Sequence, residues 1–188
     1  MGEFSPLVEV TIGPSLRGAL SGCRKVPRKV PMPTLKYPSE QFPGPPSVTV
    51  DIPDGWSPVR VPGTLLAARR TDTGGRFAPN VVVRGFTRSG DFTIGRALAE
   101  LKSYVEDRTD GEMDAPFALE IESVPFVGVN VSWTDEAVGD VVQAHLFAGA
   151  RRGQVVDLLQ VTGSVGGEQV DVEYESLQQL MQTVRITR

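Results

Sequence analysis

The fold is decided by residues 141–161, which read VVQAHLFAGARRGQVVDLLQV. Two apolar runs, 141–148 and 154–161, flank the segment GARRG (149–153), whose terminal glycines are typical of a hairpin loop. Both runs carry apolar residues on both faces, as expected for central strands that are covered on both sides. This stretch therefore predicts two neighbouring antiparallel strands, from which the rest of the sheet can be inferred.

Further strands are predicted in the sequence before this hairpin. Several of these segments show apolar and polar residues that alternate with a period of two. The alternating segments are 47–53, 117–123 and 127–133, and residues 64–71 and 79–87 are two more expected strands. Residues 93–107 change to a helical period, with Thr93 as the expected N-cap, and residues 174–184 carry a second helical apolar stripe. The order βββ-α-ββββ-α predicts an α+β domain with one mainly antiparallel sheet of about seven strands and two amphipathic helices on its faces.

Composition divides the chain near residue 46. Residues 1–46 hold nine of the fifteen prolines and carry a net charge of +3, whereas residues 47–188 carry −7. Because proline fixes φ and removes a hydrogen-bond donor, we expect residues 1–46 to form an extended basic arm and residues 47–188 to form one α/β domain. The overall charge of −4 gives no general attraction to nucleic acid, and no apolar run is long enough for a transmembrane helix.

The arm contains a short strand-like segment, PLVEVTIGP, at residues 6–14. Val8, Val10 and Ile12 alternate with Leu7, Glu9 and Thr11, so the three β-branched side chains share one face. Such a segment can add to a sheet edge of its own domain or of a partner. Val8, Val10 and Ile12 are therefore candidate partner-binding residues.

A basic stretch, RKVPRKVP, follows at residues 24–31. Its charged side chains, Arg24, Lys25, Arg28 and Lys29, belong either to a solvated linker or to a contact with an acidic surface, including that of the domain itself. In the domain, Arg151 and Arg152 lie in the predicted hairpin loop and are further candidate contacts with a protein partner.

Cys23, the single cysteine, ends the sequence LSGC (20–23), which matches the lipid-attachment box of bacterial lipoproteins. A lipoprotein signal also needs a positively charged start and an apolar core, but the segment before Cys23 contains Glu9, Pro14 and Arg17. Each charged residue costs about 2.5–3.5 kcal/mol at the centre of an inserting segment. We therefore expect a cytoplasmic protein, and lipid attachment at Cys23 in the cell envelope is the alternative.

The sequence predicts no catalytic, cofactor or metal site. One His and one Cys are too few for a zinc or iron site within one chain. We interpret His145 as a structural or surface residue, because a general base needs a nucleophile and an orienting group that the sequence does not place. Asp135, Glu136 and Asp140 lack the ligand order of an EF-hand and predict a solvated acidic loop. We therefore expect no enzymatic activity and no cofactor.

The strand that runs into DIPDGW (51–56), the hairpin pair, the helix, the four-strand meander and the terminal helix together resemble the PsbP-like fold. This fold is shared by the photosystem subunit PsbP and by bacterial DcrB-type proteins. Over about residues 46–188 the chain is most similar to LpqN/LpqT-type proteins of mycobacteria and their relatives, many of which are lipoproteins or secreted. The resemblance implies binding, docking or chaperone-like roles and supplies no common catalytic residues.

From this resemblance we expect a non-enzymatic protein-binding or adaptor module, with the arm docked on a sheet edge or on a partner. The alternative is a cell-envelope lipoprotein or a carrier of a small apolar ligand. An apolar cavity of ligand size that opens to solvent would indicate the carrier.

Overall fold

The computed structural model describes residues 34–42, 44–74, 76–168 and 170–187. The chain divides into two compact units, residues 1–37 and 38–188. Of the first unit only residues 34–37 are described, and they form neither helix nor strand. The predicted arm strand at residues 7–12, the cysteine at position 23 and the basic stretch at residues 24–29 lie outside the described residues.

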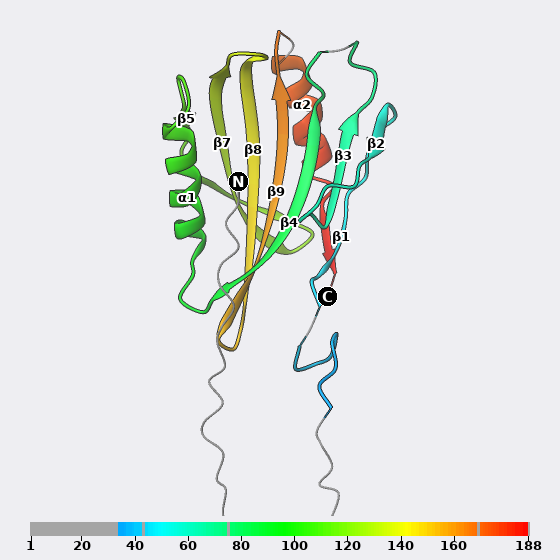
Figure 1. Cartoon of the computed structure of the whole chain (residues 1–188), viewed down its shortest axis with the longest axis vertical. Coiled ribbons are helices and arrows are strands. Elements are labelled where there is room, and N and C mark those ends of the chain that lie inside the picture. The colour runs from blue at the N-terminus through cyan, green and yellow to red at the C-terminus, as the bar shows by residue number, and fades with distance from the viewer. Residues whose placement is uncertain (1–33, 43, 75, 169, 188) are drawn as a thin grey trace, which may run out of the picture. The chain divides into compact units, whose positions relative to one another are not determined.

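An eight-stranded antiparallel sheet forms the centre of the second unit, as far as the chain is described (Figure 1). Its spatial order is β2-β3-β4-β9-β8-β7-β5, and β6 pairs with the first part of β7. The strands are β2 (Trp56–Pro58), β3 (Leu66–Arg70), β4 (Asn80–Ser89), β5 (Glu112–Met113), β6 (Phe117–Ile121), β7 (Val124–Asp135), β8 (Gly139–Arg152) and β9 (Val155–Gly166). The predicted α+β architecture with one mainly antiparallel sheet is confirmed.

The β8–β9 hairpin lies at the centre of this sheet, between β7 on one side and β4 on the other. Arg152 pairs with Val155, which leaves a two-residue turn that begins with Gly153 at φ +56°. The predicted five-residue loop at 149–153 is therefore wrong, because strand pairing continues up to the turn. Arg151 and Arg152 belong to the end of β8 rather than to a loop.

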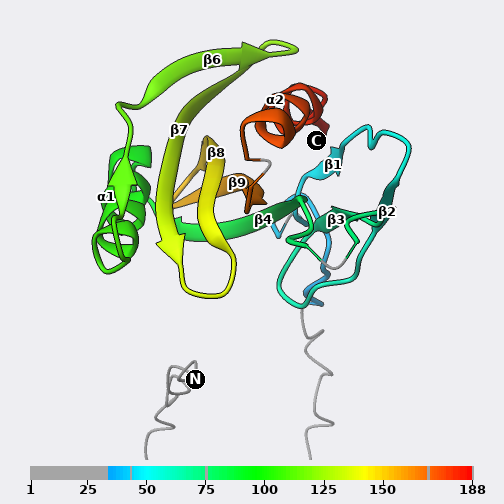
Figure 2. The same ribbon diagram turned by 90° about the horizontal axis from the view of Figure 1, so that it is seen from above.

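Two helices cover opposite faces of the sheet (Figure 2). The first, α1 (Ile94–Glu106), begins after Thr93, whose side chain accepts a hydrogen bond from the Arg96 N–H and so confirms the predicted N-cap. It packs against an apolar cluster that includes Val129, Trp133 and Phe147. The second helix, α2 (Val170–Met181), begins four residues earlier than predicted and packs on the other face. No helix within the described ranges combines the length and the apolar character that a membrane crossing needs.

Gly163 of β9 sets the distance between the sheet and α2. A Cβ atom at this position would lie 2.7 Å from Sδ of Met181 and 2.8 Å from the terminal methyl carbons of Leu177. Such distances are too short for a side chain, so the helix packs directly on the glycine backbone. The space between α2 and the sheet is therefore filled by protein atoms at this point.

The first predicted strand, residues 47–53, belongs elsewhere in the fold. Only β1 (Ser47–Thr49) is a strand, and it pairs with β10 (Arg185–Thr187) in a separate two-stranded sheet. The predicted turn at Asp54-Gly55 is confirmed, with Gly55 at φ +79°, and it leads into β2. The local alternation of residues 47–53 predicted a strand but held no information about its partner at the other end of the chain.

Candidate functional site

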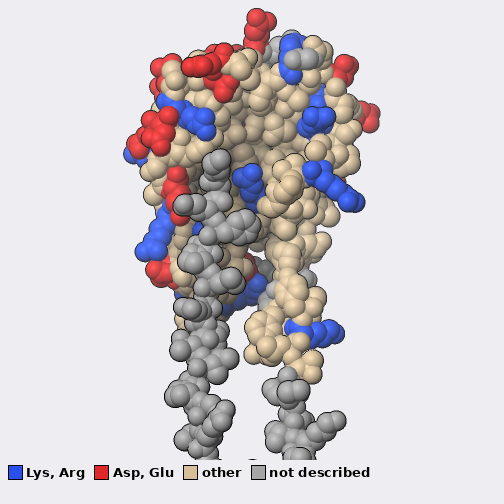
Figure 3. Space-filling model, in the orientation of Figure 1, with Lys and Arg blue, Asp and Glu red and all other residues tan. Residues whose placement is uncertain are grey.

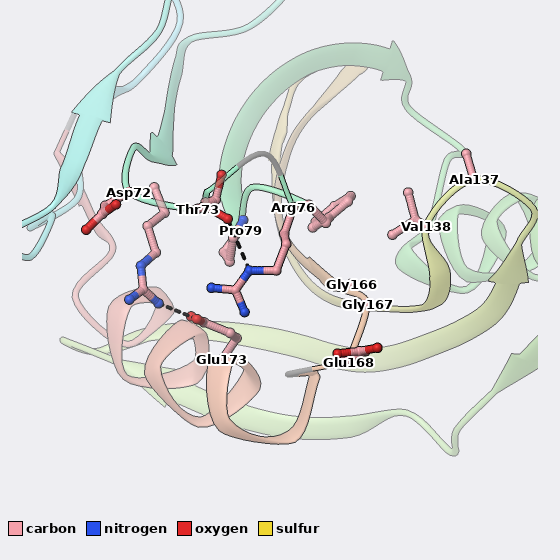
Figure 4. Close-up of a pocket in the computed structure, with 12 residues that line it drawn as sticks. Asp72, Thr73, Arg76, Pro79, Ala137, Val138, Gly166, Gly167, Glu168 and Glu173 are labelled. Atoms are coloured by element: carbon pink, nitrogen blue, oxygen red, sulfur yellow. Dashed lines mark hydrogen bonds and ion pairs between the residues drawn. The ribbon is translucent and has the colours of Figure 1, made fainter.

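The site with the most concentrated polar chemistry lies at the end of the sheet where α2 begins. Two cavities flank the first turn of this helix. The larger, which we call the end cavity, has a volume of about 550 Å³ and is bounded by the β3–β4 connection, the β7–β8 turn, the end of β9 and α2 (Figure 4). The smaller, the side cavity, has a volume of about 270 Å³ and lies between α2, β7 and β8 and the segment that follows β5.

Charged side chains from three elements line the end cavity. Arg70 of β3 forms an ion pair with Glu173 of α2. Arg76 extends into the cavity, and its Nε–H donates a 3.1 Å hydrogen bond to the backbone carbonyl of Thr73 (Figure 4). Phe77 and Val138 form an apolar wall. Among the described residues that line the cavity, no nucleophile is hydrogen-bonded to a general base.

Hydrogen-bonding side chains and valines together line the side cavity. The hydroxyl of Tyr174 donates a 2.6 Å hydrogen bond to Oδ1 of Asn130, and Nδ2 of Asn130 donates to Asp114 at 3.2 Å. Asp171 lies on the same rim, and Val142 and Val170 contribute apolar surface. Burial raises the pKa of the Tyr174 hydroxyl. Two carboxylates beside an apolar floor suit the ammonium or guanidinium group of a basic side chain.

Acidic side chains extend this polar end beyond the two cavities. Asp135, Glu136 and Asp140 lie at the turn between β7 and β8, and Glu168 follows β9. The space-filling view shows acidic residues gathered at this end of the domain (Figure 3). Oδ1 of Asp135 accepts hydrogen bonds from the N–H groups of Ala137 and Val138 and so stabilises the turn. Among the described residues there is no group of three His, Cys, Asp or Glu side chains that could hold a metal ion.

His145 lies apart from this end, on the sheet face that α1 covers in part. Its side chain is 3% exposed, and its ring stacks on Phe147. The Gln160 amide and the Thr162 hydroxyl lie 3.2 Å and 3.1 Å from Nδ1, within hydrogen-bond distance. Nε2 has no hydrogen-bond partner in the described part of the chain. Burial lowers the pKa of His145 to about 4, which keeps the ring neutral at pH 7.

The predicted site residues do not come together in one place. Val8, Val10, Ile12, Cys23, Arg24, Lys25, Arg28 and Lys29 lie outside the described residues. Arg152 forms an ion pair with Asp157, whereas Arg151 is exposed at the end of the hairpin. The hairpin arginines lie at the opposite end of β8 from the β7–β8 turn and the end cavity.

Sequence reasoning did not identify the residues that line the two cavities. Arg70, Asn130 and Tyr174 come from three elements that only the tertiary structure brings to one end of the sheet. One local signal was available for Tyr174, because it precedes Leu177 by three residues and so continues the apolar stripe of α2.

No protein-family model and no curated protein sequence matches this chain. Solved structures do match it. One is LpqN, involved in cell envelope biogenesis of Mycobacterium tuberculosis, with 14% identity, a TM-score of 0.62, and coverage of 78% of this chain and 86% of LpqN. Another is the cyanobacterial PsbP of Synechocystis, with 13% identity, a TM-score of 0.50, and coverage of 76% of this chain and 92% of PsbP.

These matches define the class of fold. The chain has a PsbP-like α+β fold, as the order of its elements predicted. At the level of fold, the expected likeness to LpqN-type proteins is also confirmed.

Proposed function

We propose that the chain is a non-enzymatic protein-binding module with an adaptor or chaperone-like role, in which the N-terminal arm docks on a sheet edge or on a partner. The observation that carries this proposal is the open edge of the sheet at β6. Among the described residues, β6 pairs with β7 and with no other strand. An open strand edge presents unpaired backbone N–H and C=O groups, which pair readily with another extended segment.

Basic residues of the arm and of the hairpin supply further contacts in this proposal. The acidic end of the domain is complementary in charge to the basic stretch that contains Arg24, Lys25, Arg28 and Lys29. Charge complementarity raises the association rate and selects the partner more than it raises affinity. Arg151 is exposed and is proposed to contact a partner directly, whereas Arg152 is held by Asp157.

A location in the cell envelope, with Cys23 as the attachment residue, is the second candidate. It draws on the fold likeness to LpqN, a protein of cell envelope biogenesis. The intact mass of the native protein tests it, because a chain that begins at a diacylated Cys23 differs from the full-length chain. A full-length soluble chain would exclude this candidate.

We do not propose a carrier of an apolar ligand. Both described cavities have charged or polar side chains in their linings. At Gly163 the helix α2 packs directly on the sheet, so no apolar ligand fits between them there.

Deletion of residues 1–45 tests the adaptor proposal. The tagged full-length chain and the truncated chain are expressed in the source cells, and co-purifying proteins are quantified by mass spectrometry. We expect at least tenfold lower recovery of a specific partner with the truncated chain, provided that its circular dichroism and thermal unfolding show a folded domain. Equal recovery by a folded truncated chain would contradict the role of the arm.

A further inference from the structure

We propose that the outer edge of β6 is the docking site for residues 7–12 of the same chain, which pair with it as an added strand. This inference rests on the proposed function and names both the edge and its occupant. Other occupants, such as a second copy of the chain, are outcomes of the test below.

The pairing register shows which backbone groups of β6 are open. Ile121 pairs with Val124 across a two-residue turn, in which Glu122 and Ser123 have φ of +46° and +67°. Positive φ at both positions is the geometry of a type I′ hairpin, in which the residues next to the turn form a hydrogen-bonded pair. Because this pattern alternates, Ala118 and Glu120 direct their N–H and C=O groups away from β7.

The residue opposite Glu120 supports this assignment. Glu120 pairs with Pro125, which has no N–H to donate. A proline fits without loss at a position where the two strands exchange no hydrogen bonds. The open backbone groups of Glu120 therefore point to the outer edge.

The side chains of β6 leave an apolar row incompletely covered along this edge. Ile121 is buried, Leu119 packs against the same core cluster, and Phe117 is 44% exposed over the backbone of Gly128. Ala118 and Glu120, on the opposite face, are exposed. An added strand with apolar residues on one face would extend the row formed by Phe117, Leu119 and Ile121.

The other end strands of the sheet are less suited to such pairing. β2 has three residues and ends in Pro58, which cannot donate to a ladder. β5 has two residues. The five residues of β6 contain no proline, so β6 offers the longest regular edge among these three strands.

Residues 7–12 match this edge in length and pattern. The segment has six residues between Pro6 and Pro14, and Val8, Val10 and Ile12 share one face. The side chains of Val8 and Val10 would lie beside the apolar row of β6, while those of Leu7 and Glu9 face the side of Ala118 and Glu120.

Several antiparallel registers place valine side chains of the arm beside the apolar row of β6. The charges of Glu9 and Glu120 select between them. If Val10 lay opposite Leu119, Glu9 would lie opposite Glu120, and like charges directly across a strand pair are unfavourable. A shift that places Val8 opposite Leu119 puts Glu9 opposite Ala118 and removes this repulsion. We therefore infer the second register, in which Val8 and Val10 lie opposite Leu119 and Phe117 and Ile12 lies beyond the end of β6.

The connection favours docking within one chain. Residues 13–46 join the segment to β1 and span on the order of 100 Å when extended, so they do not restrict which edge residues 7–12 can reach. A tethered segment has an effective concentration of about millimolar for short flexible linkers, and less for longer ones. A partner strand must then compete with the arm for the same edge.

Hydrogen exchange of the full-length chain tests the proposal. We expect peptides that cover residues 7–12 to exchange at least tenfold more slowly than an unstructured segment, independently of protein concentration. Val10→Asp places a charge beside the apolar row, so the protection of residues 7–12 should be lost and exchange at Ala118 and Glu120 should increase by a similar factor. Thr11→Ala, on the opposite face, is the matched control and should keep the protection.

Because Val10 lies in the arm, its substitution leaves the folding of the domain untouched, and exchange in β8 and β9 provides the check. Unprotected residues 7–12 in the wild type, or unchanged exchange at Ala118 and Glu120 in Val10→Asp, would overturn the proposal. Protection that rises with concentration together with dimer formation would overturn the docking within one chain. If residues 7–12 are unprotected but deletion of residues 1–45 still weakens partner recovery, the proposed function stands and this inference fails.

Discussion

The hydroxyl of Tyr174 in α2 donates a 2.6 Å hydrogen bond to Oδ1 of Asn130 in β7, and this bond joins the helix to the sheet at the rim of the side cavity. Asn130 in turn donates to Asp114, which follows β5, so three segments share one chain of polar contacts. The shape of the side cavity depends on these contacts, because two of its walls meet at this bond.

Substitution of Tyr174 by Phe should lower the free energy of unfolding by about 1 kcal/mol, because the Asn130 carbonyl group loses its donor in a partly buried place. Urea unfolding measures this change. Tyr104→Phe is the matched control, since the Tyr104 hydroxyl is paired with Arg108 at an exposed position and its loss should cost less. Equal effects of the two substitutions would contradict the structural role of the Tyr174–Asn130 bond.

Gly163→Ala should lower the free energy of unfolding by about 1–3 kcal/mol, because the new methyl group overlaps Met181 and Leu177. Gly149→Ala is the control on the neighbouring strand. A Cβ atom there would contact Ile94 and Val156 at 3.8–3.9 Å, an ordinary contact distance, so little change is expected. Thermal unfolding of both variants measures the difference, and a neutral Gly163→Ala would show that α2 packs less closely than described.

His145 should make the stability of the domain depend on pH. Its pKa is about 4 in the folded protein and about 6.5 in the unfolded chain, so the unfolded chain binds the proton more tightly. The stability contribution of the neutral ring is complete above pH 6.5 and is lost as the pH falls toward 4. Between pH 7 and pH 5 this loss amounts to about 2 kcal/mol.

The comparison of the wild type with His145→Gln isolates this effect. Free energies of unfolding from urea denaturation at several pH values should fall more steeply for the wild type between pH 6.5 and pH 4. Parallel curves for the two proteins would mean that His145 titrates near its ordinary value and is not buried as a neutral ring.

Carbodiimide coupling should join Lys25 or Lys29 to the carboxylates of the acidic end, among them Asp114 and Asp171. This expectation follows from the charge of the arm and from the two carboxylates at the side cavity, Asp114 and Asp171. The Lys102–Glu106 pair, with Nζ and Oε1 3.7 Å apart, supplies an internal positive control for the reaction. Mass spectrometry of the digested monomer identifies the links.

The double substitution Asp114→Asn, Asp171→Asn should remove the links to the side cavity, whereas Glu175→Gln, an exposed position on the same helix, should leave them. High salt should weaken them, because exposed charges are screened. Links from Lys25 and Lys29 distributed over the carboxylates in proportion to their exposure would contradict a specific contact.

Local patterns were sufficient for the elements that carry their own periodic signal. The alternation in β7 and the helical period of residues 94–106 predicted the correct element types, and Thr93 predicted the start of α1. The lengths of β8 and β9 were underestimated, because Arg151 and Arg152 read as loop residues although the strand pairing includes them. Polar residues at the end of a long hairpin remain in the strands when the ladder continues to the turn.

The sequence by itself determined the α+β class, the two amphipathic helices and the difference in net charge between residues 1–46 and 47–188, because periodicity and charge are properties of neighbouring residues. Only the tertiary structure decided that β1 pairs with β10, that α2 packs directly on Gly163 and that Tyr174, Asn130 and Asp114 meet at one cavity. These contacts join residues that are far apart in the chain. Which distant residues contact each other depends on the surfaces that the central sheet leaves unpaired. A local sequence pattern does not contain this information.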